Sequence, residues 1–128
     1  MKKILVVDDE EDIRELLQDI LTDSGYDVST AEDGLKAVTQ VKKDPPDLII
    51  LDVMMPVISG PRLMTLLRTY SEPICNIPVI ICSASHVVDE VLKSGEFQVQ
   101  PEDCIAKPFQ LKDLLRKVHE RVCRDSLQ

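Results

Sequence analysis

Three aspartates, a serine and a lysine stand where short apolar runs end, and these residues are the best suited to chemistry. They are Asp8, Asp9, Asp52, Ser83 and Lys107. Continuous apolar runs of this length are typical of parallel strands that are buried on both faces. Parallel strands bring their carboxyl ends to one edge of a sheet, where ligands bind in open α/β folds. We therefore expect the five side chains to converge on one site.

The expected site combines negative charge with a cation and a hydroxyl. Clustered carboxylates repel one another unless positive charge neutralises them, and Lys107 supplies one such charge. Ligands that are all oxygen favour Mg²⁺ over zinc. This chemistry suits phosphoryl transfer, in which the charge on the phosphoryl oxygens must be neutralised. Asp52 is the predicted nucleophile, because it stands alone at a strand end whereas Asp8 and Asp9 are paired as metal ligands.

The elements that position these residues alternate regularly along the chain. The expected strands are residues 4–7, 27–30, 48–51, 78–82 and 104–106, and each is followed by a segment of helical periodicity. Apolar positions on the expected helices include Leu16, Leu35 and Leu111, and Gly25 and Gly95 are expected stops. The pattern predicts one domain over residues 1–128, with five βα units and helices on both faces of a parallel sheet.

Composition narrows the class of protein. The chain has 128 residues and a formal net charge of −8, which argues against direct binding to nucleic acid. No apolar run approaches membrane-spanning length and no signal peptide is visible, so we expect a cytoplasmic protein without a membrane partner. The four cysteines contain no CxxC pair, so the sequence predicts no zinc site.

Four motifs occur in the order found in receiver domains of two-component response regulators. They are ILVVDDE at 4–10, LDVMMP at 51–56 with Gly60, PVIICSA at 78–84 and KPF at 107–109. The chain resembles this family over nearly its whole length. The resemblance implies a doubly wound, flavodoxin-like three-layer sandwich with strand order 2-1-3-4-5. It fits a stand-alone chemotaxis-type receiver or the receiver fragment of a larger regulator.

The same resemblance implies a set of metal ligands. Asp9 would bind Mg²⁺ directly, and Asp8 would act mainly through water. Asp52 would be both a ligand and the phosphoacceptor, and the backbone carbonyl of Met54 would be a further ligand. Asp8 and Asp9 could instead cap the helix that follows them, since aspartate is favoured there. That reading accounts for one carboxylate and leaves the remaining acids unexplained.

The resemblance also implies how phosphorylation would occur and be read. Ser83 would turn toward the phosphoryl group, and Lys107 would pair with it and form a cis bond to Pro108. The donor would be a phosphohistidine on a sensor kinase or a histidine phosphotransfer protein. The domain would catalyse its own phosphorylation and slow dephosphorylation and would not be a conventional enzyme. Its output would pass to a partner protein, to an output domain or through a phosphorylation-dependent dimer.

Two features depart from the family pattern. Cys104 stands three residues before Lys107, where the family usually has an aromatic switch residue, and a thiol cannot act as a large rotating gate. The stretch 85–103 also looks longer than usual, and Phe97 is one candidate for a substitute aromatic. We therefore expect intact phosphorylation chemistry with an atypical output surface.

Three other functions compete with the phosphorylation switch. A receiver-like module that binds proteins without phosphorylation is the main alternative, and Cys104 motivates it. A small-molecule hydrolase that works through an aspartyl phosphate needs an acid two residues after the nucleophile, where this chain has Met54. A nucleotide-binding domain is disfavoured because neither GxxxxGK nor GxGxxG is present.

Overall fold

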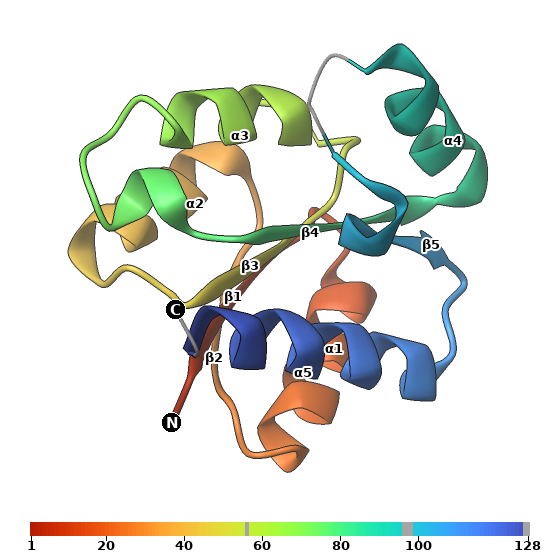
Figure 1. Ribbon diagram of the computed structural model, residues 1–128, viewed down its shortest axis with the longest axis horizontal. Helices are drawn as coiled ribbons and strands as arrows, with labels where there is room; N and C mark the ends of the chain where they lie inside the picture. The colour runs from red at the N-terminus through yellow and green to blue at the C-terminus, as the bar shows by residue number, and fades with distance from the viewer. Residues whose placement is uncertain (56, 96–98, 127–128) are drawn as a thin grey trace.

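The strands of this protein form one parallel sheet (Figure 1). The computed structural model describes residues 1–55, 57–95 and 99–126, and within these residues five strands pair in the order β2-β1-β3-β4-β5. The strands are β1 (Lys3–Val7), β2 (Asp27–Ala31), β3 (Leu48–Leu51), β4 (Val79–Ala84) and β5 (Cys104–Lys107). All four pairings are parallel. The predicted doubly wound fold and its strand order are therefore confirmed.

Helices cover both faces of the sheet and make the middle layer a buried one. The helices are α1 (Glu11–Asp23), α2 (Gly34–Lys43), α3 (Gly60–Leu67), α4 (Ser85–Ser94) and α5 (Leu111–Ser126). In Figure 1, α1 and α5 lie below the sheet, and α2 and α3 lie above it. No helix in the described part of the chain is long and apolar enough to cross a membrane.

Alternate residues of each strand enter opposite cores. In β1, Leu5 packs in the core shared with α2, α3 and α4, whereas Ile4 packs in the core shared with α1 and α5. In β5, Cys104 packs in the core shared with α2, α3 and α4, and Ile105 packs in the core shared with α1 and α5. This alternation follows from the two-residue period of a strand. It explains why the central strands read as continuous apolar runs, because both faces of each strand are covered.

Three leucines at expected helix-stripe positions face solvent instead. Leu16, Leu35 and Leu111 are exposed, so for them the expectation of burial is wrong. Leu17 of α1 and Leu114 of α5 are buried and define the inward faces. Each of the three exposed positions lies beside the apolar stripe of its helix, where the periodicity alone does not distinguish the centre of the stripe from its margin.

The described residues between α4 and β5 include a helix stop and a short turn. Gly95 ends the helix in the left-handed conformation, with φ of 66°, as the sequence predicts. A short 3₁₀ helix, η2 (Pro101–Asp103), then leads directly into β5. Arg121 of α5 pairs with Asp103 at the end of this turn. Phe97, the candidate substitute aromatic, lies outside the described residues.

Candidate functional site

Neighbouring strands bring the predicted site residues to one edge of the sheet. Leu51 at the end of β3 is in register with the end of β1 and with Ile81 of β4. Asp8 and Asp52, which follow β1 and β3, are therefore neighbours, and Ser83 projects beside them from β4. All three side chains are buried. The expected convergence of these residues is present in the structure.

The carboxylate of Asp52 is held by three polar groups. The Ser83 hydroxyl donates to Asp52 Oδ1 at 2.7 Å, and the Met54 backbone N–H donates to the same oxygen at 3.3 Å. Lys107 Nζ lies 3.5 Å from the second oxygen, Oδ2. Asp52 is only 4% exposed. These contacts fix the direction of the carboxylate and leave it beside a cation and a hydroxyl donor.

Lys107 reaches the site from the end of β5 and makes its shortest contact with Asp8. The distance from Lys107 Nζ to Asp8 Oδ2 is 2.7 Å, and Glu10 Oε1 lies 3.6 Å from the same nitrogen. The peptide bond from Lys107 to Pro108 is cis, which confirms that prediction. One ammonium group therefore contacts three different carboxylates.

The negative charge of the buried carboxylates is only partly neutralised by Lys107. Burial raises the pKa of Asp8, and the hydrogen bond and charge of Lys107 offset that effect only in part. Burial acts to lower the pKa of Lys107, but the hydrogen bond and charge of Asp8, with the charge of Asp52, outweigh it, so the pKa is raised. The lysine therefore stays charged, while the buried carboxylates retain repulsion that a second cation would relieve.

Four acidic side chains are close enough to share one metal ion. An oxygen of each of Asp8, Asp9, Glu10 and Asp52 lies within 4.8 Å of the others. Asp9 and Glu10 are exposed to solvent, whereas Asp8 and Asp52 are buried. Donors that are all oxygen fit a hard cation such as Mg²⁺. The sequence prediction did not include Glu10, although it directly follows the aspartate pair. The main chain explains its place, because the Glu10 N–H donates to Asp8 Oδ1 at 2.9 Å.

The aspartate pair does not act as the N-cap of the helix that follows. The N-cap residue of α1 is Glu10, which makes no side-chain capping bond. Asp8 is directed instead toward Lys107. Met54 lies at the predicted place beside Asp52, and its side chain is 65% exposed. The role of its backbone carbonyl as a metal ligand stays a prediction.

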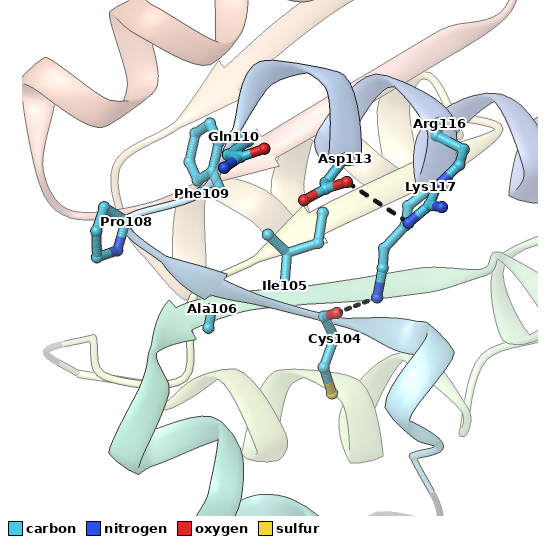
Figure 2. A pocket seen from close by; sticks show the side chains of 9 residues that line it. All are labelled: Cys104, Ile105, Ala106, Pro108, Phe109, Gln110, Asp113, Arg116 and Lys117. Carbon is cyan, nitrogen blue, oxygen red and sulfur yellow. Dashed lines mark hydrogen bonds and ion pairs between the residues drawn. The ribbon is translucent and has the colours of Figure 1, made fainter.

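Cys104 occupies an interior position. The side chain is 5% exposed and belongs to the core on the α4 side of the sheet. Its carbonyl oxygen accepts from Lys117 Nζ at 2.6 Å, while its sulfur points to the opposite side of the strand (Figure 2). The part of Cys104 that faces α5 is thus its main chain, and its thiol is a small core group.

A hollow of about 380 Å³ lies where β5 meets α5 (Figure 2). Phe109 and Gln110 line one part of it, and Asp113, Arg116 and Lys117 line the α5 side. Arg116 pairs with Asp113 at 3.6 Å, so the hollow carries charges of both signs. It lies next to the strand that supplies Lys107.

The cysteines provide a direct check of burial on both faces of the sheet. Burial raises the pKa of Cys82 to about 12 and that of Cys104 to about 11, and the thiolate is the reactive form. Folded, reduced protein treated with iodoacetamide near neutral pH should gain two adducts, at Cys75 and Cys123, which are partly exposed. Urea should raise the number to four. Mass spectrometry of peptides would locate each adduct, and native labelling of Cys104 as fast as Cys75 would contradict its buried position.

The fold and the edge site define a class of protein. A doubly wound sheet with acids after its first and third strands, a hydroxyl on the fourth and a lysine on the fifth is the arrangement of a receiver. The family model described as the response regulator receiver domain matches residues 4–119. This chain therefore belongs to the response regulator receiver domain family.

The curated relatives are longer proteins, and this chain matches only a part of each. Response regulator MprA of Mycobacterium ulcerans (strain Agy99) is 33% identical over 126 residues, which cover 98% of this chain and 52% of that protein. The chain thus spans about half the length of the curated relatives it matches.

Two solved structures are similar over nearly their whole length. The chemotaxis response regulator CheY4 of Vibrio cholerae has a TM-score of 0.78 at 30% identity, covering 94% of this chain and 98% of that one. The signal receiver domain of a signal transduction histidine kinase from Syntrophus aciditrophicus has a TM-score of 0.84 at 31% identity, covering 96% of this chain and 91% of that one.

Proposed function

We propose that this receiver domain is a phosphorylation-controlled signalling switch in which Asp52 accepts a phosphoryl group from a phosphohistidine. The donor is a sensor histidine kinase or a histidine phosphotransfer protein. One observation carries the proposal: the buried Asp52 carboxylate lies 2.7 Å from the Ser83 hydroxyl and 3.5 Å from the Lys107 ammonium. A domain that served only as a binding surface has no need to bury a carboxylate between these two groups.

We assign a part of the transfer to each residue, and the contacts of the site support this assignment. An oxygen of Asp52 attacks phosphorus, the bond from phosphorus to the donor imidazole nitrogen breaks, and that nitrogen recovers its proton. Lys107 neutralises charge on one phosphoryl oxygen, and Ser83 donates a hydrogen bond to another. In this structure Lys107 donates a hydrogen bond to Asp8. Its ammonium group must therefore turn from Asp8 toward the phosphoryl group during the transfer. That movement links the chemistry to a change in the site.

The acidic group fits the Mg²⁺ that receiver domains use. Asp8, Asp9 and Asp52 would hold the ion, with the Met54 carbonyl as a further ligand, and Glu10 lies close enough to take part. Bound Mg²⁺ would neutralise the incoming phosphoryl oxygens and the carboxylates together. The raised pKa of Asp8, caused mainly by burial, supports the need for this second cation.

The phosphoryl group would bias an equilibrium between two states of the domain, and a partner would bind the favoured state. Ser83 would be the residue that responds to the phosphoryl group. The domain would catalyse its own phosphorylation and slow dephosphorylation and act on no separate small molecule. Its output would pass to a downstream protein, to an output domain or through a dimer that forms on phosphorylation. We place this signalling in the cytoplasm.

Acetyl phosphate provides the test, because it needs no identified kinase. Protein with Mg²⁺ and acetyl phosphate should gain the mass of one phosphoryl group, and Asp52→Asn or the addition of EDTA should abolish the gain. Intact-mass spectrometry measures the product, and far-ultraviolet circular dichroism confirms that the variant is folded. A protein that gains no phosphoryl group under conditions that label a control receiver domain would contradict the proposal and favour the phosphorylation-independent binding module.

A further inference from the structure

The side chains of His119 and Cys123 lie together on α5, away from the acidic site. Cys123 Sγ is 3.3 Å from His119 Nε2 and 3.7 Å from Nδ1. Residues four apart share one face of a helix, so the sequence spacing itself produces this contact. His119 is exposed and Cys123 is partly exposed. Solvent, and any ion in it, can therefore reach both donor atoms.

The spacing of these atoms is that of two ligands on one tetrahedral ion. Zinc bonds of about 2.3 Å to sulfur and about 2.0 Å to nitrogen, at the tetrahedral angle, place the two ligand atoms about 3.6 Å apart. The 3.3 Å distance from sulfur to Nε2 is close to this value, but sulfur lies almost as near to Nδ1, so the ring must rotate before either nitrogen lone pair is directed at an ion bound to sulfur. The imidazole rotates easily about the bond from Cβ to Cγ. This rotation lets one nitrogen lone pair point to the position of a metal ion bound to the sulfur. We propose that His119 and Cys123 form a two-ligand site for a zinc-class divalent cation, with water completing the coordination.

The surroundings of the pair favour a cation. Cys123 lies in the last turn of α5, which ends at Ser126, and the carbonyl end of a helix attracts positive charge. Arg121, which lies between the two ligands in the sequence, is paired with Asp103, so its charge is offset.

This site is separate from the acidic cluster in both position and chemistry. The helix α5 starts beyond the carboxyl end of β5 and returns across the sheet. Near its end, Val122 lines a hollow with Lys2 and Pro78, which precede β1 and β4. The pair therefore lies toward the opposite edge of the sheet, as the path of α5 in Figure 1 shows. Nitrogen and sulfur donors select a borderline ion, whereas the carboxylates select a hard one.

Binding exchanges a proton for the metal. The thiol of Cys123 loses its proton to solvent and forms a bond from sulfur to the metal, and the neutral imidazole of His119 contributes its nitrogen lone pair. No oxidant or reductant is involved. Because the metal displaces a proton, acid should release it.

Cobalt is the probe for this site, since a bond from thiolate to Co²⁺ gives a charge-transfer absorption that carboxylate ligands do not give. Reduced protein is titrated with Co²⁺ in excess Mg²⁺, which occupies the acidic cluster. The wild type and Cys75→Ser should show the band, and Zn²⁺ should remove it by displacing the cobalt. Cys123→Ser should show no band, and His119→Ala should bind at least about tenfold more weakly, since even changes outside the first ligands cost that much.

Cys75 is the matched control because it is also a partly exposed thiol. Circular dichroism of each variant confirms the fold, which is expected to be unchanged because the two ligands lie at the surface. Absence of the band at millimolar Co²⁺ would overturn the proposal. So would a band that persists in Cys123→Ser, or equal affinity in His119→Ala.

Discussion

Replacement of Lys107 by methionine is expected to slow the phosphorylation of Asp52 by about a hundredfold. Methionine keeps the length and much of the packing of the lysine stem but removes the charge that lies 3.5 Å from Asp52 Oδ2. Loss of one preorganised donor to developing charge in an enclosed site typically costs a factor of about 10² to 10³ in rate. The measurement is the initial rate of mass gain with acetyl phosphate at saturating Mg²⁺.

Lys112→Met is the matched control for this prediction. Lys112 is exposed on α5, so its loss changes the net charge equally without changing the site. The control should phosphorylate at the wild-type rate, and both variants should give the wild-type circular dichroism spectrum. Equal rates for Lys107→Met and the wild type would show that Asp52 needs no cation from β5, which would remove Lys107 from the proposed chemistry.

Much of the fold could be predicted because its central strands are buried on both faces. Such strands become continuous apolar runs in the sequence, and each run here ends at or beside a polar residue that begins the site. The parallel arrangement then places Asp8, Asp52 and Ser83 together without any knowledge of side-chain conformations. The order of the strands was implied by the family resemblance and did not follow from the apolar pattern.

The contacts of the site could not be predicted from residue types alone. The participation of Glu10 depends on the turn between β1 and α1, where its N–H bonds to Asp8 Oδ1. The inward direction of the Cys104 thiol depends on which face of β5 meets α4, and the sequence left that open. The exposure of Leu16 similarly depends on the exact rotation of α1 about its axis.

The sequence contains the pair on α5, but the prediction of no zinc site was based on the absence of a CxxC motif among the four cysteines. A histidine four residues before a cysteine becomes a chelating pair only if the segment is helical. The predicted helix over this region, combined with that spacing, was sufficient to suggest the contact that the structure shows between His119 and Cys123.

Replacement of Gly60 by alanine is expected to lower the free energy of unfolding by about 3 kcal/mol, as overpacking of a closed interior can. An added Cβ would lie 2.3 Å from the carbonyl oxygen of Asp52 and 2.9 Å from the Cα of Val53. Both atoms belong to the main chain, so no side-chain rotation relieves the overlap. Urea unfolding followed by far-ultraviolet circular dichroism measures the loss, since the chain has no tryptophan.

Gly95→Ala separates this steric effect from the ordinary cost of losing a glycine. Gly95 has φ of 66° but has open space around it, so alanine there should cost only about 1 kcal/mol through backbone conformation. A loss in Gly60→Ala no larger than that in Gly95→Ala would contradict the close approach of α3 to the site.

The same contact predicts a functional loss in Gly60→Ala that exceeds its effect on stability. The atoms that must move are the carbonyl of Asp52 and the start of the loop whose Met54 N–H bonds to the Asp52 carboxylate. A shift of this segment redirects the carboxylate relative to Ser83 and Lys107, and misplacement of a reacting group by about 1 Å can cost about a hundredfold in rate. The folded fraction of Gly60→Ala should therefore phosphorylate more slowly than that of Gly95→Ala, because Gly60 lets the helix approach the segment that aims Asp52.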